Sequence, residues 1–235
     1  MTMKRDNLAW RAVRLLPLIL GLSAGPGRGQ DAATIKSVAE QGHEKAGEML
    51  ANQGREEPAG MRGEKAMSTV LSKGNPVEIA GRLPQVGTVA PPFTLTGADL
   101  SDVPLAKFAG KKKILNIVIS LDTGTCALSA SRFNEDVSKL SGTVLINISA
   151  DLPFAQKRFC ESHSLTNIVT LSTMRGTPFG KDYGVQIMSG PLAGLLSRAV
   201  VVLDETNRVT YTEQVAEMSH EPNYEAALRA VKSPR

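Results

Sequence analysis

Cys126, one of two cysteines in the chain of 235 residues, occupies the position best suited to chemistry. In the stretch NIVISLDTGTCALSASRF (residues 116–133), an apolar, strand-like run ends shortly before it and a helical pattern begins. We therefore expect Cys126 in the first turn of a helix, where free amide groups and the positive end of the helix dipole favour an anion. A thiol in such a place loses its proton more easily, and the thiolate is the nucleophilic form. Cys126 is thus a candidate nucleophile, exposed at the strand end in a shallow pocket.

Two neighbours of Cys126 fit this role, but a structural role fits as well. Thr123 can cap the helix or donate a hydrogen bond towards the sulfur, and Gly124 lets the backbone come close. Structural cysteines also lie near helix ends. In an exported protein, a disulfide between Cys126 and Cys160 would close the loop between them and stabilise the fold. The residues alone leave both interpretations open.

Several other chemistries lack their characteristic residue patterns. A Cys-x-x-Cys pair, which marks dithiol oxidoreductases, is missing from the sequence. The three histidines (His43, His163 and His220) have no spacing suited to a metal site or to an obvious Cys-His pair. No Gly-rich nucleotide loop and no Ser-His-Asp signature stands out. The sequence therefore predicts no cofactor and no metal, and activation of Cys126 would come from the helix terminus together with a cation.

The basic residues of the chain are concentrated at its start. The net charge of +4 depends largely on the first 24 residues, where Asp6 alone opposes four basic side chains, namely Lys4, Arg5, Arg11 and Arg14. The rest of the chain is too balanced in charge to create a strong phosphate-binding field, so we expect no nucleic-acid partner.

The same segment predicts export. Its basic start is followed by the apolar run LLPLILGLSAG and then by small and polar residues, which is the layout of a signal peptide. The run is too short to span a bilayer, and Pro17 interrupts it. We expect a signal peptide over residues 1–25, cut near Ala24, and a periplasmic or secreted mature chain without stable membrane insertion. The chain would be cytoplasmic if this segment were not a working signal.

The remaining chain divides into a linker and one compact domain. Residues 26–69 are rich in Gly, Ala, Glu, Lys and Gln, so we expect a flexible or partly helical linker there. The domain is expected over residues 70–235 and begins with a β-hairpin around residues 73–76.

Strands and helices alternate after this hairpin. Buried strands are expected over residues 111–120, 143–150 and 167–173, and two further strands over 198–215 are joined by a turn at 204–207. One helix is expected with Cys126 in its first turn and its end before Gly142, one from Asp151 as its N-cap, and one over residues 221–233. The order predicts an α/β fold with a central mixed β-sheet flanked by helices.

The domain resembles a known family in several segments. DTGTC, SADLPFAQKRFC and GPLAGLLSRAVVV occur in order, and together they resemble the thiol peroxidases, the atypical two-cysteine branch of the peroxiredoxins. The likeness covers roughly residues 70–232 without large gaps. It implies a thioredoxin-like fold and reduction of hydroperoxides, with a preference for organic ones. It also implies a homodimer and a thioredoxin-like reductant.

The resemblance assigns roles to four residues. Cys126 would be the peroxidatic cysteine, which attacks the peroxide and becomes a sulfenic acid. Cys160 would be the resolving cysteine, which forms an intramolecular disulfide with it. Thr123 matches the family's hydroxyl that hydrogen-bonds the thiolate and the peroxide. Arg198 matches the arginine that stabilises the thiolate and polarises the oxygen–oxygen bond.

One position departs from the family pattern. The family has Pro, three residues, Thr, two residues and Cys, and this chain has Ile119 at the proline position. Isoleucine supplies apolar cover but restores a backbone N–H and relaxes φ, so slower attack or altered selectivity is expected. Two alternatives to the peroxidase therefore stay open, namely a non-catalytic thioredoxin-like binding domain with a structural disulfide and a thiol–disulfide exchange protein.

Overall fold

In a computed structural model of the chain, the described residues are 67–232. The predicted signal peptide and most of the predicted linker, up to residue 66, lie outside them. Among residues 67–232, no helix is both long and apolar enough to cross a membrane.

The described chain begins with the predicted N-terminal hairpin. Strands β1 (Ser68–Ser72) and β2 (Asn75–Ile79) pair antiparallel and form a separate two-stranded sheet. Lys73 and Gly74 form the two-residue turn with φ values of 50° and 79°, which match the type I′ turns of tight hairpins. The first strand begins at Ser68 rather than at Val70.

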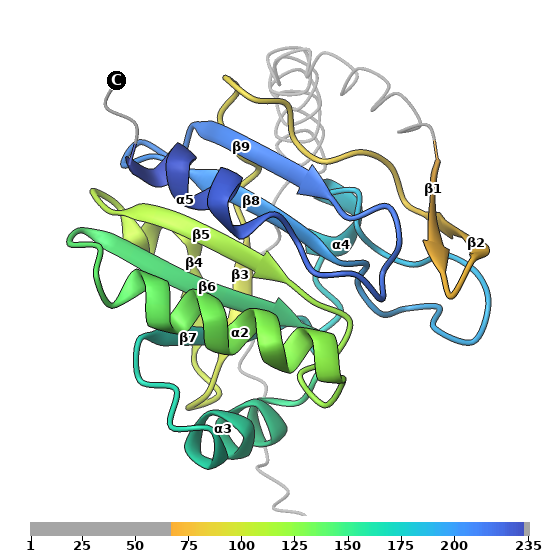
Figure 1. Cartoon of the computed structure of the whole chain (residues 1–235), viewed down its shortest axis with the longest axis horizontal. Coiled ribbons are helices and arrows are strands. Elements are labelled where there is room, and N and C mark those ends of the chain that lie inside the picture. The colour runs from red at the N-terminus through yellow and green to blue at the C-terminus, as the bar shows by residue number, and fades with distance from the viewer. Residues whose placement is uncertain (1–66, 233–235) are drawn as a thin grey trace, which may run out of the picture. The chain divides into compact units, whose positions relative to one another are not determined.

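A mixed sheet of seven strands forms the centre of the domain (Figure 1). Its strand order is β4-β3-β7-β6-β5-β8-β9. The three central strands β5, β6 and β7 run parallel, whereas β3 and β8 pair antiparallel to their neighbours. The strand bounds are β3 (Thr94–Gly97), β4 (Asp102–Pro104), β5 (Lys112–Ile117), β6 (Thr143–Ser149), β7 (Ile168–Ser172), β8 (Ala199–Leu203) and β9 (Val209–Gln214).

Helices cover the two faces of this sheet. Helices α2 (Gly124–Val137) and α5 (Tyr224–Lys232) lie on the face that Figure 1 turns towards the viewer. The short helices η1 (Leu105–Phe108) and α4 (Phe179–Asp182) contribute to the core on the other face, and α3 (Pro153–Ser162) packs near β7. A central mixed sheet flanked by helices, with an N-terminal hairpin, confirms the predicted architecture.

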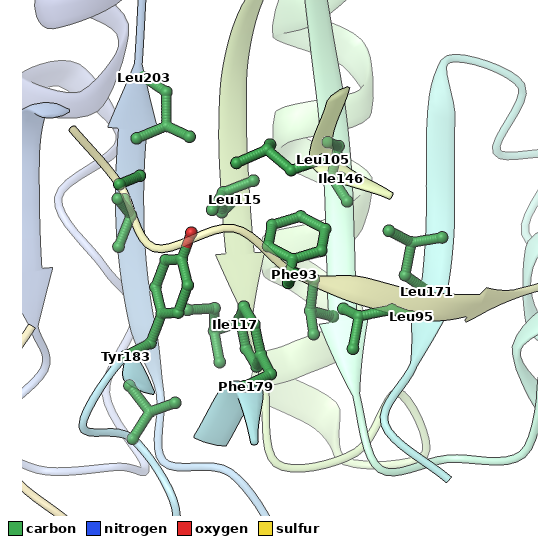
Figure 2. Packing of buried hydrophobic residues seen from close by; sticks show 14 of the residues in the cluster. Phe93, Leu95, Leu105, Leu115, Ile117, Ile146, Leu171, Phe179, Tyr183 and Leu203 are labelled. Carbon is green, nitrogen blue, oxygen red and sulfur yellow. The ribbon is translucent and has the colours of Figure 1, made fainter. Parts of the chain in front are cut away.

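Side chains of the central strands alternate between the two faces of the sheet, and each face has its own hydrophobic core. In β5, Ile114 points to the face covered by α2 and α5, whereas Leu115 and Ile117 belong to the opposite cluster. Figure 2 shows this opposite cluster, which contains Leu115 and Ile117. Phe93 lies among the strand residues there and packs edge-on against Phe179, with ring centroids 5.4 Å apart. This two-sided burial explains the continuous apolar run in the sequence.

The predicted N-cap of α3 is wrong. Leu152 occupies that position and Pro153 begins the helix, as the sequence led us to expect for this proline. The Asp151 carboxylate instead accepts hydrogen bonds from the Ser120 hydroxyl (2.7 Å) and the Leu121 amide (2.8 Å). These donors belong to the loop before α2, so Asp151 fixes the loop that leads to Cys126.

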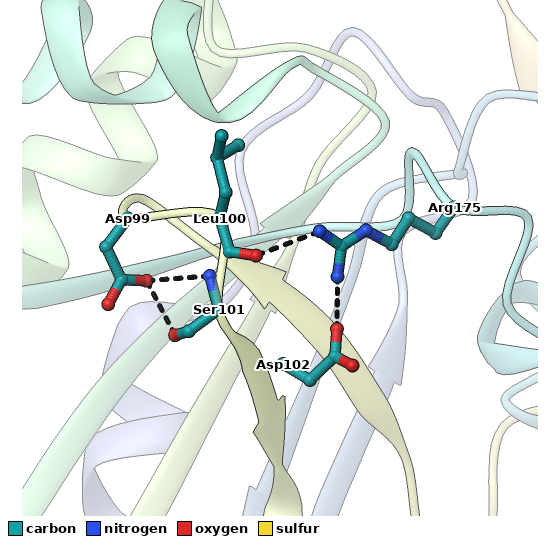
Figure 3. Close-up of polar contacts among 5 residues, drawn as sticks. All are labelled: Asp99, Leu100, Ser101, Asp102 and Arg175. Atoms are coloured by element: carbon teal, nitrogen blue, oxygen red, sulfur yellow. Dashed lines mark hydrogen bonds and ion pairs between the residues drawn. The ribbon is translucent and has the colours of Figure 1, made fainter.

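Polar side chains hold the turn between β3 and β4 (Figure 3). The Asp99 carboxylate accepts hydrogen bonds from the amide (3.0 Å) and hydroxyl (2.6 Å) of Ser101, which lower the pKa of Asp99. Arg175 donates to the Leu100 carbonyl at 2.9 Å and pairs with Asp102. The turn is thus fixed from two sides, and its residues line a cavity beside Cys160.

Candidate active site

Cys126 lies in the first turn of α2, as predicted. Thr123 occupies the N-cap position, and the helix begins at Gly124. The expectation of an exposed sulfur in a shallow pocket is wrong, because the Cys126 side chain is fully buried. It packs in an apolar cluster with residues from the loop before α2, from α2 and from α3, namely Val118, Leu121, Ala130 and Phe159.

The structure places Arg198 directly against this sulfur. Arg198 is 1% exposed, and its Nη2 donates to the Cys126 Sγ at 3.2 Å. Its Nε donates to the Met218 carbonyl at 2.9 Å. Within residues 67–232, no carboxylate lies within ion-pair distance of Arg198. The Cys126 sulfur is therefore the side-chain atom that this buried guanidinium group contacts.

Thr123 lies in the predicted place but makes a different bond. Its hydroxyl donates to the Ser120 carbonyl at 3.0 Å and makes no side-chain capping bond to α2. Thr123 is therefore the N-cap residue by position, but its hydroxyl makes neither a capping bond nor a bond to the Cys126 sulfur in this structure. The bond to Ser120 closes the loop before the helix and keeps Thr123 on the wall of a cavity near Arg198.

The sequence analysis did not predict a set of three buried, hydrogen-bonded polar side chains beneath α2. The Ser129 hydroxyl donates to the Cys126 carbonyl at 3.0 Å. Asn116 of β5 bonds both Ser129 (3.4 Å) and Asn147 of β6 (2.7 Å). All three side chains are fully buried, so they connect the first turns of α2 to the centre of the sheet. Asn116 and Asn147 are polar residues within apolar strands, which is the signal that could have revealed them.

A cavity of about 710 Å³ opens beside the catalytic candidates. Ile119 lines it and also packs against the cluster that contains Cys126. Cys126 itself does not line the cavity. The other walls come from the hairpin, the start of α2, the loop before β8 and the loop after β9, and their residues include Lys73, Pro76, Val77, Thr123, Leu192, Arg198 and Met218.

Cys160 lies on α3 and is half-buried. It packs against the apolar cluster that contains Cys126 and Phe159. Both cysteines are free thiols in this structure. Burial, and in addition the negative charge of Glu161, raise the pKa of Cys160. Cys160 is therefore mostly protonated at neutral pH, and a second cavity of about 660 Å³ borders it.

In the described part of the chain, no metal site accompanies the thiols. Among residues 67–232, His, Cys, Asp and Glu side chains form no cluster of three or more that could hold a metal ion. The chemistry that the arrangement itself offers is that of a thiol beside a guanidinium group.

Comparisons with known proteins show which family the chain resembles. A family model described as Redoxin matches residues 85–228. A thiol peroxidase from Mycobacterium bovis is 48% identical over 165 residues, which cover 70% of this chain and 99% of that relative. A solved peroxiredoxin-like protein from Aquifex aeolicus is 38% identical with a TM-score of 0.66, covering 71% of this chain and 97% of that one. A solved thiol peroxidase from Chromobacterium violaceum is 29% identical with a TM-score of 0.65, and the match covers 70% of this chain and 95% of that one.

The fold and the site define a thioredoxin-like oxidoreductase that works through cysteine. The chain belongs to the redoxin family, as a peroxiredoxin of the thiol peroxidase type, and its activity is thiol-dependent reduction of peroxides. The predicted family, thioredoxin-like fold and enzyme class are confirmed. The relatives do not favour the alternatives of a non-catalytic binding domain or a thiol–disulfide exchange protein.

Proposed function

We propose that Cys126 is the peroxidatic cysteine and that Arg198 assists its attack. The Cys126 thiolate attacks the terminal oxygen of the hydroperoxide and forms a sulfur–oxygen bond while the oxygen–oxygen bond breaks. The leaving oxygen takes a proton and departs as an alcohol or as water, and Cys126 is oxidised to a sulfenic acid. The observation that carries this proposal is the 3.2 Å contact between Arg198 Nη2 and Cys126 Sγ at a helix start.

Arg198 has a further donor for the substrate. Its Nη1 is buried and has no hydrogen-bond partner within residues 67–232. This donor is placed to bind a peroxide oxygen as negative charge develops on it. The Thr123 hydroxyl lies on the cavity wall and is the second donor in the proposal, because rotation away from the Ser120 carbonyl would direct it at the peroxide.

Cys160 is the proposed resolving cysteine. Its sulfur attacks the sulfenic acid of Cys126, forms the disulfide and releases water, and a thioredoxin-like donor then reduces the disulfide by exchange. The packing of Cys160 against the apolar cluster that contains Cys126 supports this pairing. Both thiols are free and lie on different helices, and the proposal includes a local rearrangement of α2 or α3 that brings the sulfurs to bonding distance.

Replacing Cys160 with serine tests this assignment. We expect Cys160→Ser to consume one equivalent of cumene hydroperoxide and then to stop, since Cys126 stays a sulfenic acid. Dimedone should label Cys126 in this variant, as detected by peptide mass spectrometry, whereas the wild type should show the Cys126–Cys160 disulfide. Unchanged turnover with a thioredoxin-like reductant in Cys160→Ser would contradict the resolving role.

The cavity supports organic hydroperoxides as the preferred substrates. Apolar side chains from three separate segments, namely Val77, Ile119 and Leu192, line a space large enough for a substituent of aromatic size. Ile119 lies between this cavity and the cluster that contains Cys126, so its side chain limits access to the sulfur.

Ile119→Pro is expected to raise kcat/KM for cumene hydroperoxide by about threefold, because the smaller, fixed ring opens the approach to Cys126. Steady-state consumption of the peroxide measures the change, and Ile119→Val is the conservative control. A fall in kcat/KM for the proline variant at unchanged melting temperature would contradict this prediction, since it would show that isoleucine at position 119 supports faster reaction of Cys126 than proline does.

Exposed apolar residues support the proposal of a homodimer. Leu152 and Phe154 are 55% and 63% exposed, and they follow Asp151, which bonds the loop before α2. A second copy of the chain would bury these side chains beside the active site.

The proposal also includes export of the protein. The order of residues 1–25, which is basic, then apolar, then small, supports export to the periplasm or the exterior.

A further inference from the structure

The β1–β2 hairpin forms the outer wall of the cavity. Residues from its turn and from β2, including Lys73, Pro76 and Val77, line the space opposite Thr123 and Arg198. This hairpin is not a strand of the central sheet, since it forms a sheet of its own. Its position relative to the catalytic residues therefore depends on contacts with loops.

Glu217 supplies the polar contacts at the tip of this hairpin. Its two carboxylate oxygens accept hydrogen bonds from the turn amides of Lys73 (3.0 Å) and Gly74 (2.9 Å). Lys73 is a non-glycine residue at positive φ, so an anion that binds both turn amides stabilises a conformation that lysine rarely adopts. These bonds and those from Ser219 lower the pKa of Glu217 to about 2, and the carboxylate is therefore charged throughout the neutral range.

The backbone around Glu217 reinforces the attachment. The Leu71 amide donates to the Ala216 carbonyl at 2.7 Å, and the Met218 amide donates to the Leu71 carbonyl at 2.8 Å. The Glu217 carboxylate also accepts from the Ser219 hydroxyl at 2.8 Å. Residues 216–219 thus bind the hairpin along β1 and at its turn.

Two of these four residues, Met218 and Ser219, also contact Arg198 and the start of α2. The Met218 carbonyl accepts from Arg198 Nε at 2.9 Å, and the Ser219 carbonyl accepts from the Thr125 hydroxyl at 3.1 Å. One short segment therefore links the hairpin turn and β1 to the Arg198–Cys126 pair, whereas β2 is attached separately, through the Met188 amide and the Glu78 carbonyl (2.8 Å). Glu217 is the only member whose side chain bonds the hairpin turn in the structure of residues 67–232.

We propose that Glu217 is a specificity-determining positioning residue, whose carboxylate holds the hairpin tip so that the cavity fits the organic part of a hydroperoxide. Its loss frees the Lys73–Gly74 turn and widens the cavity, so a bulky substituent loses its contacts with Pro76 and Val77. Hydrogen peroxide has no such substituent and needs only the Arg198–Cys126 pair. This inference rests on the proposed roles of Cys126 and Arg198.

The test compares two peroxides in full-length variants. For Glu217→Ala we expect KM for cumene hydroperoxide to rise about tenfold, with kcat within about twofold of wild type and kcat/KM for hydrogen peroxide unchanged within about twofold. Glu217→Gln keeps the shape but loses the charge, so a smaller rise in KM is expected. Glu225→Ala removes an exposed glutamate of α5 and is the matched control, which should leave both substrates unaffected.

The outcomes separate the inference from the site assignment. Equal losses of kcat/KM for both peroxides would overturn the specificity role, since they would indicate displacement of Arg198. An unchanged KM for cumene hydroperoxide in both Glu217 variants would also overturn it. Turnover that survives in Cys126→Ser would instead overturn the site assignment. Faster hydrogen exchange at the Lys73 and Gly74 amides, measured in the more conservative Glu217→Gln variant, is the expected structural counterpart of the rise in KM.

Discussion

Cys126→Ser is expected to abolish peroxide turnover, with kcat/KM for cumene hydroperoxide at least about a thousandfold below wild type. Serine nearly matches cysteine in size, so the cluster around Val118 and Phe159 should stay packed. Its hydroxyl, however, stays protonated at neutral pH and does not supply the nucleophile that the thiolate supplies. The measurement is consumption of cumene hydroperoxide by the reduced, full-length protein with a thioredoxin-like reductant.

Two controls make this result specific to the sulfur of Cys126. Cys160→Ser should still reduce one equivalent of peroxide, so loss of the first turnover in Cys126→Ser alone separates the two cysteines. A melting temperature within a few degrees of wild type would show that the fold persists. Turnover that survives in Cys126→Ser would move the peroxidatic role to Cys160, whose raised pKa makes it the weaker candidate at neutral pH.

The local part of the site could be predicted from the sequence. The apolar run before Cys126 becomes β5, and the helical spacing after it becomes α2, because strands buried on both faces and amphipathic helices have distinct periodicities. The position of Cys126 in the first turn follows from these two elements alone. Its complete burial does not, since it depends on Phe159 of α3 and on Arg198 of the loop before β8.

Long-range partners account for most of what the sequence could not reveal. Arg198 is distant from Cys126 in the chain and was assigned only through the family resemblance, because an arginine before a strand is usually an ordinary surface cation. Glu217 bonds a turn that lies far upstream of it, and no local pattern distinguishes it from other glutamates. Asp151 has a good capping position locally, yet the donors of the loop before α2 bind it instead.

Short elements escaped prediction for a different reason. Strands β3 and β4 hold four and three residues, and their segment contains prolines and turn-forming residues. The periodicity of so few residues is too weak to indicate a strand. Their pairing with each other and with β7, together with the Arg175 contacts to the turn, supplies the stability that local propensity lacks.

Arg198→Met should lower kcat/KM for cumene hydroperoxide by about a hundredfold, because methionine fills much of the space but provides no charge and no donor. Arg198→Lys should recover only part of this loss, since an ammonium group lacks the planar fork that reaches both the Met218 carbonyl and the Cys126 sulfur. Arg229→Met, which changes an exposed arginine of α5, is the matched control.

A second measurement separates the two effects of Arg198. In the Cys160→Ser background, alkylation of Cys126 by iodoacetamide depends on the thiolate but not on an oxygen–oxygen bond. If Arg198 both favours the thiolate and stabilises charge on the departing oxygen, Arg198→Met should slow alkylation by about tenfold and peroxide reduction by about a hundredfold. Equal slowing of both reactions would show that Arg198 acts on the thiolate alone. Stabilisation of charge on the departing oxygen would then have to come from another donor, for which Thr123 on the cavity wall is the candidate.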